Sequence, residues 1–207
     1  YEQRFAPNYN LLSFDLIGHG KSVKLKTYEE YHMDRLVEDL YTLMNHVGIE
    51  RCILISHSFG ALIALSFLGR HQDKVEVNIF MSPHFAVARM KSMQIAKPFL
   101  LLASQITSML SPPRIRGHID YSFYVHTGDW NLRRMFADIQ NTGVRVHLYY
   151  LRQSSAFDGE DILARINVPT LIIHGELDTL FPVRWSQLMA GKIKNVKTVF
   201  LEGANHI

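Results

Sequence analysis

The sequence predicts an α/β fold, in which a mostly parallel sheet carries helices on both faces. Short apolar segments alternate with segments of helical periodicity, in the order strand, helix, strand, helix, strand. The strand segments are apolar without interruption, which is typical of parallel strands that are buried on both faces. The 207 residues, of which 47% are hydrophobic and 20% charged, suffice for one globular domain that carries an insertion.

The first part of the core, residues 1–83, is expected to contain three strands and two helices. Thr27 and Glu30 have the spacing of a capping box, and the apolar residues after them recur at helical spacing until Gly48. A second, fully apolar helix is expected to end near Gly69. The expected strands are residues 9–14, 51–55 and 75–81.

The alternation of strand and helix segments is interrupted between the two parts of the core. Residues 84–157 are rich in methionine and aromatic residues and are expected to form an inserted layer of helices, a cap. This cap is interpreted as a surface insertion with its own core, as a lid that forms one wall of an apolar pocket, or as both. The core resumes over residues 158–207. Its expected elements are a helix at 161–166, a strand at 169–173, a helix at 183–190 and a strand at 197–201.

A serine stands in the turn between the second strand and the apolar helix. Ser56-x-Ser58-x-Gly60 is a near match to the nucleophile elbow, small-x-Ser-x-Gly, which exposes the serine hydroxyl above the sheet. Small residues are needed on either side because larger ones would collide where the strand folds back against the helix. Strain in such a turn costs roughly 1–3 kcal/mol and is mostly tolerated where it serves chemistry. We therefore predict that Ser58 is a nucleophile.

A serine hydroxyl needs a base to accept its proton and a carboxylate to orient that base. His206 lies in a short loop directly after the last expected strand, and Glu176 and Asp178 lie just beyond the strand before it. His57 is adjacent to Ser58, but neighbouring side chains diverge in a sharp turn, so His57 is not expected to reach the serine. Three other histidines near strand ends remain open as bases: His19, His84 and His174.

These motifs together resemble the α/β-hydrolase fold family, in particular its capped, serine-dependent members that are similar to esterases and lipases. In that family the nucleophile, acid and base follow in the chain order Ser, Asp or Glu, His. The resemblance implies that Ser58, Asp178 and His206 form a catalytic triad. Residues 167–178 resemble the family's acid motif, residues 203–206 its Gly-x-x-His ending, and residues 15–22 its Asp-x-x-Gly-x-Gly-x-Ser loop.

The resemblance also implies an oxyanion hole, whose first donor would be the backbone amide of Phe59 at the start of a helix. The family's second donor comes from a loop after an earlier strand, and no such segment precedes Tyr9. The chain is therefore expected to be a fragment that lacks the first strands, the final helix and half of the oxyanion hole, and to be a poor enzyme as it stands.

The expected function is hydrolysis of a carboxylic ester or related acyl compound through an acyl-enzyme. The apolar insertion indicates a small to medium hydrophobic acyl or alcohol group in the substrate, and the reaction is expected to need neither a metal nor an organic cofactor. The same three residues leave open a thioesterase, a C–C bond hydrolase, an aminopeptidase or a cofactor-free peroxidase. A non-catalytic ligand receptor or scaffold with this fold is an alternative of another class.

Other classes are disfavoured by particular residues. A Walker A loop ending in Gly20-Lys21-Ser22 would need glycine at position 15, which is Asp15, and a dinucleotide fingerprint would need glycine where Val23 stands. Haloalkane dehalogenases and epoxide hydrolases of the resembling fold use an aspartate nucleophile, and Ser58 argues against both.

Charge and composition limit the partners. The net charge of +3 is too small to indicate nucleic-acid binding, and Lys21, Lys24 and Lys26 are expected in a solvated loop. No apolar run reaches the ~20 residues that a membrane span requires. The single cysteine, Cys52, fits a reducing compartment, and a cytoplasmic location is expected. The oligomeric state is left open.

Overall fold

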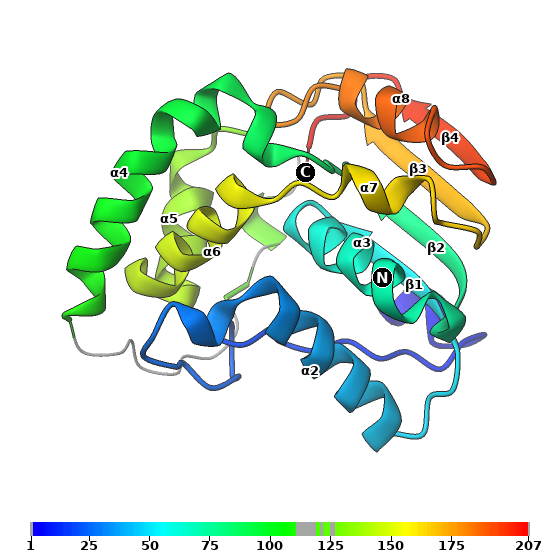
Figure 1. Cartoon of the computed structure of the whole chain (residues 1–207), viewed down its shortest axis with the longest axis horizontal. Helices are drawn as coiled ribbons and strands as arrows, with labels where there is room; N and C mark the ends of the chain where they lie inside the picture. The colour runs from blue at the N-terminus through cyan, green and yellow to red at the C-terminus, as the bar shows by residue number, and fades with distance from the viewer. Residues whose placement is uncertain (1, 111–118, 121, 125–126, 207) are drawn as a thin grey trace.

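A four-stranded parallel sheet is the framework of the α/β part of the protein (Figure 1). The computed structural model describes residues 2–110, 119–120, 122–124 and 127–206. The strands are β1 (Cys52–His57), β2 (Val75–Met81), β3 (Thr170–Gly175) and β4 (Val196–Leu201), in the order β1-β2-β3-β4. The predicted α/β fold with a parallel sheet is confirmed.

One face of the sheet is buried under helices. Phe80 and Ile172 pair across β2 and β3, and both are fully buried. On β1, Ile53 and Ile55 point to the opposite face of the sheet, where their side chains are 43% and 50% exposed. Alternate residues of a strand face opposite sides, so the two faces of this sheet differ in burial within this chain.

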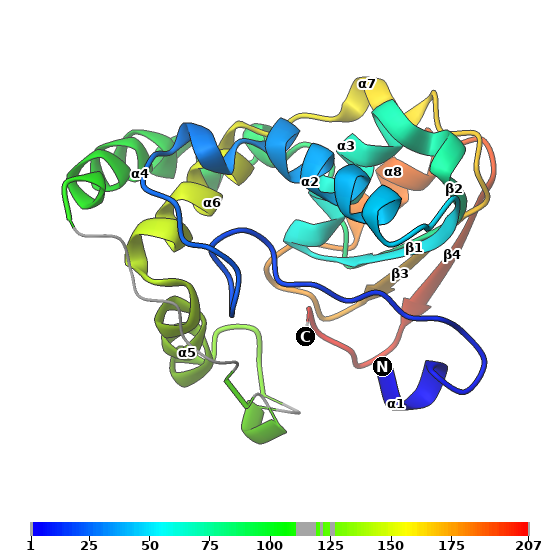
Figure 2. The same cartoon turned by 90° about the horizontal axis from the view of Figure 1, so that it is seen from below.

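Helices α3 and α8 pack on the buried face, and α2 and α7 pack against α3. Helix α3 contacts β1 and β2, and α8 contacts β3 and β4. Figure 2 shows these helices on one side of the sheet, and α1 with the N-terminal segment on the other. Eight consecutive residues of α3, from Ala61 to Leu68, are buried, which explains why this helix is apolar on every side. The bounds are α1 Glu2–Phe5, α2 Met33–His46, α3 Phe59–His71, α7 Glu160–Leu163 and α8 Arg184–Ala190.

The segment between β2 and α7 forms a layer of helices beside this core (Figure 1). Helix α6 packs against both α4 and α5. The elements are η3 (Val87–Arg89), α4 (Lys91–Ser108), η4 (Ser122–Tyr124), α5 (Leu132–Thr142) and α6 (Val144–Ala156). Residues 111–118, 121 and 125–126 of the expected cap lie outside the described residues. No helix in the described part of the chain is long and apolar enough to cross a bilayer.

Two side chains connect the helical layer to the loop at residues 15–22. The hydroxyl of Tyr150 donates to the carbonyl of Ile17 at 2.6 Å. Lys24 was expected in solvent, but its side chain is buried, and its ammonium donates to carbonyls of Gly18, Asn141 and Thr142. The last two carbonyls lie at the C-terminal end of α5, where a cation is favoured by the helix dipole. Lys24 can be buried here because these carbonyl groups at the end of α5 accept hydrogen bonds from its ammonium group.

Two local expectations were wrong. Residues 9–14 form no strand, because no strand of the sheet pairs with them. Thr27 and Glu30 do contact each other, and the Glu30 carboxylate accepts the backbone N–H of Thr27 at 2.7 Å. They precede a short 3-10 helix, η1 (Glu29–Tyr31), whereas α2 begins only at Met33. The other predicted elements differ from the observed ones only at their ends.

Candidate active site

Ser58 lies in a strained turn between β1 and α3. Its backbone has φ 52° and ψ −118°, a conformation that residues other than glycine rarely adopt. The Ser58 N–H donates to the carbonyl of Met81 at the end of β2, at 3.1 Å. A Cβ placed on Gly60 would lie 3.9 Å from Cβ of Ser56, so the two small residues face each other across the turn. That spacing also explains why serine is accommodated at position 56.

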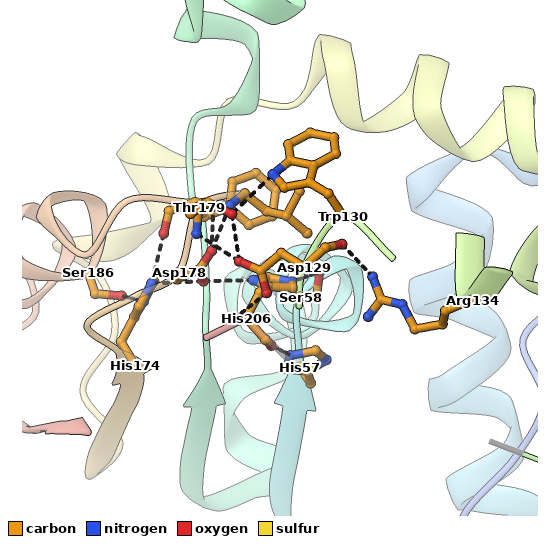
Figure 3. Close-up of polar contacts among 12 residues, drawn as sticks. His57, Ser58, Asp129, Trp130, Arg134, His174, Asp178, Thr179, Ser186 and His206 are labelled. Carbon is orange, nitrogen blue, oxygen red and sulfur yellow. Dashed lines mark hydrogen bonds and ion pairs between the residues drawn. The ribbon is translucent and has the colours of Figure 1, made fainter. Parts of the chain in front are cut away.

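The structure brings Ser58, His206 and Asp178 together (Figure 3). Nε2 of His206 lies 2.7 Å from Oγ of Ser58, and Nδ1 of His206 lies 2.7 Å from Oδ2 of Asp178. Because Nδ1 faces a carboxylate, it carries the proton, which leaves Nε2 free to accept the serine hydroxyl. The three residues come from the β1–α3 turn and from the loops after β3 and β4. Glu176, the other acidic candidate, is exposed.

Asp178 is buried and accepts hydrogen bonds at both oxygens. Its Oδ1 accepts the N–H groups of Leu180 and Phe181, at 3.0 and 2.7 Å. Burial alone would raise the pKa of Asp178. The hydrogen bonds from His174 and His206 and from the Phe181 amide outweigh burial and hold the pKa well below its ordinary value. The carboxylate is therefore charged at neutral pH.

A second histidine contacts the same oxygen. His174 is fully buried at the end of β3, and its Nε2 lies 3.0 Å from Oδ2 of Asp178 and 2.8 Å from the carbonyl of Phe181. Because Nε2 faces two acceptors, it carries the proton, and Nδ1 accepts the hydroxyl of Ser186 at 2.6 Å. His174 is thus not a base for Ser58 but a donor to the acid.

His57 contacts the backbone of the His206 loop. Its Nε2 lies 2.8 Å from the carbonyl of His206, so it donates to that loop and not to the serine. Burial lowers the pKa of His57, which favours its neutral form. His84 accepts the N–H of Ala86 through Nδ1 at 2.9 Å, and the His19 ring stacks obliquely on Tyr150.

Asp129 was not among the residues predicted from the sequence. It lies just before α5, is 5% exposed, and its Oδ1 accepts the backbone N–H of His206 at 2.8 Å. Its Oδ2 accepts the backbone N–H and the hydroxyl of Thr179, both at 2.8 Å. These partners lie 77 and 50 residues away in the chain, and no local pattern marks the contact.

Gly175 allows the loops after β3 and β4 to pack closely. A Cβ on this residue would lie 2.4 Å from the carbonyl oxygen of Ala204 and 2.5 Å from that of Asn205. The N–H of Leu177 also donates to the carbonyl of Ala204 at 2.8 Å. A glycine before the acid loop therefore lets the loop that carries His206 approach Asp178.

A family model of the alpha/beta hydrolase fold matches residues 3–207. The chain belongs to the α/β-hydrolase fold family.

Three relatives illustrate the range of this match. The "Putative carbamate hydrolase RutD" of Pseudomonas savastanoi pv. phaseolicola is 28% identical over 211 residues, covering 96% of this chain and 77% of the relative. Epoxide hydrolase 3 of Xenopus tropicalis is 37% identical over 81 residues, which are 39% of this chain and 22% of the relative. The crystal structure of MGS-M2, an alpha/beta hydrolase enzyme from a Medee basin deep-sea metagenome library, has a TM-score of 0.74 at 21% identity. That structural match covers 99% of this chain and 75% of MGS-M2. At this low identity it shows that the two proteins share a fold.

Within this α/β hydrolase, Phe59 begins α3 directly after Ser58. The first backbone N–H groups of a helix have no partner inside the helix, and the helix dipole adds positive charge there. The Phe59 ring lies edge-on to Tyr150 of α6, with ring centroids 4.9 Å apart. In the described part of the chain, no three His, Cys, Asp or Glu side chains gather as candidate metal ligands.

Proposed function

We propose that this α/β hydrolase cleaves a carboxylic ester or a related acyl compound through an acyl-enzyme on Ser58. The observation that carries the proposal is the chain of two 2.7 Å contacts from Ser58 through His206 to Asp178. In this arrangement a hydroxyl faces a neutral imidazole nitrogen, and a buried carboxylate fixes the tautomer of the imidazole.

The reaction proceeds in two halves. Oγ of Ser58 attacks the acyl carbon while Nε2 of His206 accepts the hydroxyl proton, and the Phe59 amide donates to the oxyanion. The bond to the leaving group then breaks, and His206 returns the proton to that group. Water, deprotonated by His206, then attacks the acyl carbon. The bond to Oγ of Ser58 breaks, and His206 returns its proton to Oγ, which releases the acid and free Ser58. Asp178 stays ionised and balances the charge of the imidazolium.

The helical layer over residues 84–157 acts in this proposal as a cap that forms an apolar wall of the substrate site. The contact between Phe59 and Tyr150 of α6 supports this role, because it places an aromatic side chain of the layer next to the turn that carries Ser58. An apolar wall suits a small hydrophobic acyl or alcohol group. A carbamate is a related acyl compound, and the name of the RutD relative supports its inclusion among the substrates to be tested.

The first test is labelling of the full-length protein with a fluorophosphonate probe, with the adduct located by mass spectrometry. We expect one adduct, on Ser58, that is lost in Ser58→Ala and kept in Ser56→Ala, the matched serine of the same turn. Turnover in Ser58→Ala should fall by at least about 1,000-fold. A folded wild-type protein that is not labelled would contradict the proposal and favour a ligand receptor.

A substrate panel then separates the chemistries. p-Nitrophenyl esters of increasing acyl length, together with a p-nitrophenyl carbamate, should show turnover that peaks at short to medium apolar chains. Labelling of Ser58 without turnover of any of these compounds would move the assignment to C–C bond hydrolysis or peptidase action on the same residues.

A further inference from the structure

Asp129 joins the helical layer to the two loops that carry the acid and the base (Figure 3). One carboxylate oxygen accepts the backbone N–H of His206, and the other accepts the backbone N–H and hydroxyl of Thr179, the residue after Asp178. All three distances are 2.8 Å. A buried carboxylate is costly unless its oxygens are hydrogen-bonded, so this arrangement favours one fixed geometry.

Neighbouring residues of the same segment reinforce the contact. Nδ2 of Asn205 donates to the carbonyl of Thr127 at 3.0 Å, and Nε1 of Trp130 donates to the hydroxyl of Thr179 at 3.1 Å. Arg134, in the first turn of α5, donates to the carbonyl of Asp129 at 2.8 Å. The segment from Thr127 to Arg134 therefore holds both loops from the side of the helical layer.

We propose that Asp129 is a positioning residue that fixes the His206 imidazole against Ser58 and makes the geometry of the base depend on the placement of the helical layer. This inference rests on the proposed function. The backbone N–H that Asp129 holds belongs to His206 itself, so a shift of this hydrogen bond moves the ring. A misplacement of about 1 Å in a catalytic group can lower the rate about 100-fold.

The chain offers a graded pair of substitutions and a control. Asp129→Ala leaves two backbone N–H groups without their acceptor. Asp129→Asn keeps an oxygen that can accept the His206 N–H. Its amide group meets Thr179, whose hydroxyl can rotate to accept but whose backbone N–H loses its acceptor. Thr142→Val is the matched control: Thr142 is a buried residue of the same layer whose hydroxyl bonds to Asp138, away from both loops.

The test measures kcat, KM and the fluorophosphonate labelling rate of the full-length protein and its variants. In Asp129→Ala we expect kcat and the labelling rate to fall about 100-fold with KM within about twofold of wild type. Asp129→Asn should recover only part of this loss and give a kcat between those of Asp129→Ala and wild type, and Thr142→Val should match wild type. A folded Asp129→Ala protein with the wild-type rate would overturn the inference.

Amide hydrogen exchange gives a second readout that needs no activity. The peptide that contains His206 should lose protection in Asp129→Ala, and one from α3 should not. If Asp129→Ala does not fold, the same comparison in Asp129→Asn decides, since equal protection and equal kcat to Thr142→Val would contradict a positioning role. An unlabelled wild type contradicts the proposed function, whereas the exchange experiment still shows whether Asp129 holds the His206 loop.

Discussion

At the scale of single residues, Ser58 shows why a strained backbone can be recognised in a sequence. The positive φ of 52° arises because β1 must reverse directly into α3, and the small residues at positions 56 and 60 face each other across that reversal. Asp178 was predicted together with Glu176, because both follow the same strand. The two differ in direction: Asp178 points into the protein and Glu176 into solvent.

Asp178→Asn should lower kcat by about 1,000- to 10,000-fold. All four groups around the carboxylate donate hydrogen bonds, so an amide NH2 must face two donors whichever way it is turned. The His206 tautomer is then no longer fixed. Steady-state kinetics on an ester identified in the panel measures the effect, with Glu176→Gln as the control that should keep wild-type activity. An equal loss of kcat in Asp178→Asn and Glu176→Gln would contradict the role of Asp178 in orienting His206.

At the scale of elements, the loops after β3 and β4 form one packed unit. Gly175 lies where they touch, and the carbonyls of Ala204 and Asn205 occupy the space that a side chain would need. Both loops were predicted from their sequence motifs. Their mutual contact was not visible in either motif, because it depends on β3 and β4 being neighbours in the sheet.

Gly175→Ala should destabilise the protein by about 1–3 kcal/mol and lower kcat, because the new Cβ forces the His206 loop away from Asp178. Thermal unfolding and kcat are measured together. Gly191→Ala is the matched control, since its Cβ would lie 3.6 Å from the nearest atom, at an ordinary contact distance. A Gly175→Ala protein with unchanged activity would mean that the loop tolerates the displacement.

At the scale of the whole molecule, burial of histidines connects stability to pH. His84 is 1% exposed, lies against the Trp185 ring, and its Nε2 has no hydrogen-bond partner among the described residues. Burial, together with smaller contributions from the nearby His174 and Arg184, lowers the pKa of His84 from 6.5 to about 4. The folded protein therefore binds this proton less readily than the unfolded chain.

As the pH falls from 6.5 towards 4, the unfolded chain binds the His84 proton first, so the free energy of unfolding should decrease. The full contribution is about 3 kcal/mol, from about 1.4 kcal/mol per pKa unit. Urea denaturation between pH 7 and pH 4.5 measures the slope. His84→Asn should show a smaller slope, because asparagine does not titrate and can still accept the Ala86 N–H in an Asx turn. Equal slopes in the two proteins would contradict a role for His84.

From the sequence alone the parallel α/β fold was predicted correctly, and the sequence motifs also led to the predictions of an inserted helical layer and of Ser58, Asp178 and His206 as site residues. Apolar periodicity and loop motifs are local, so they can be read along the chain. Only the tertiary structure decided which donors surround Asp178, that residues 9–14 form no strand, and that Lys24 is buried against α5. It also decided that Asp129, 77 residues before His206, holds the backbone of that histidine. These features depend on which elements become neighbours in space, and a buried polar group is placed by partners that are distant in sequence.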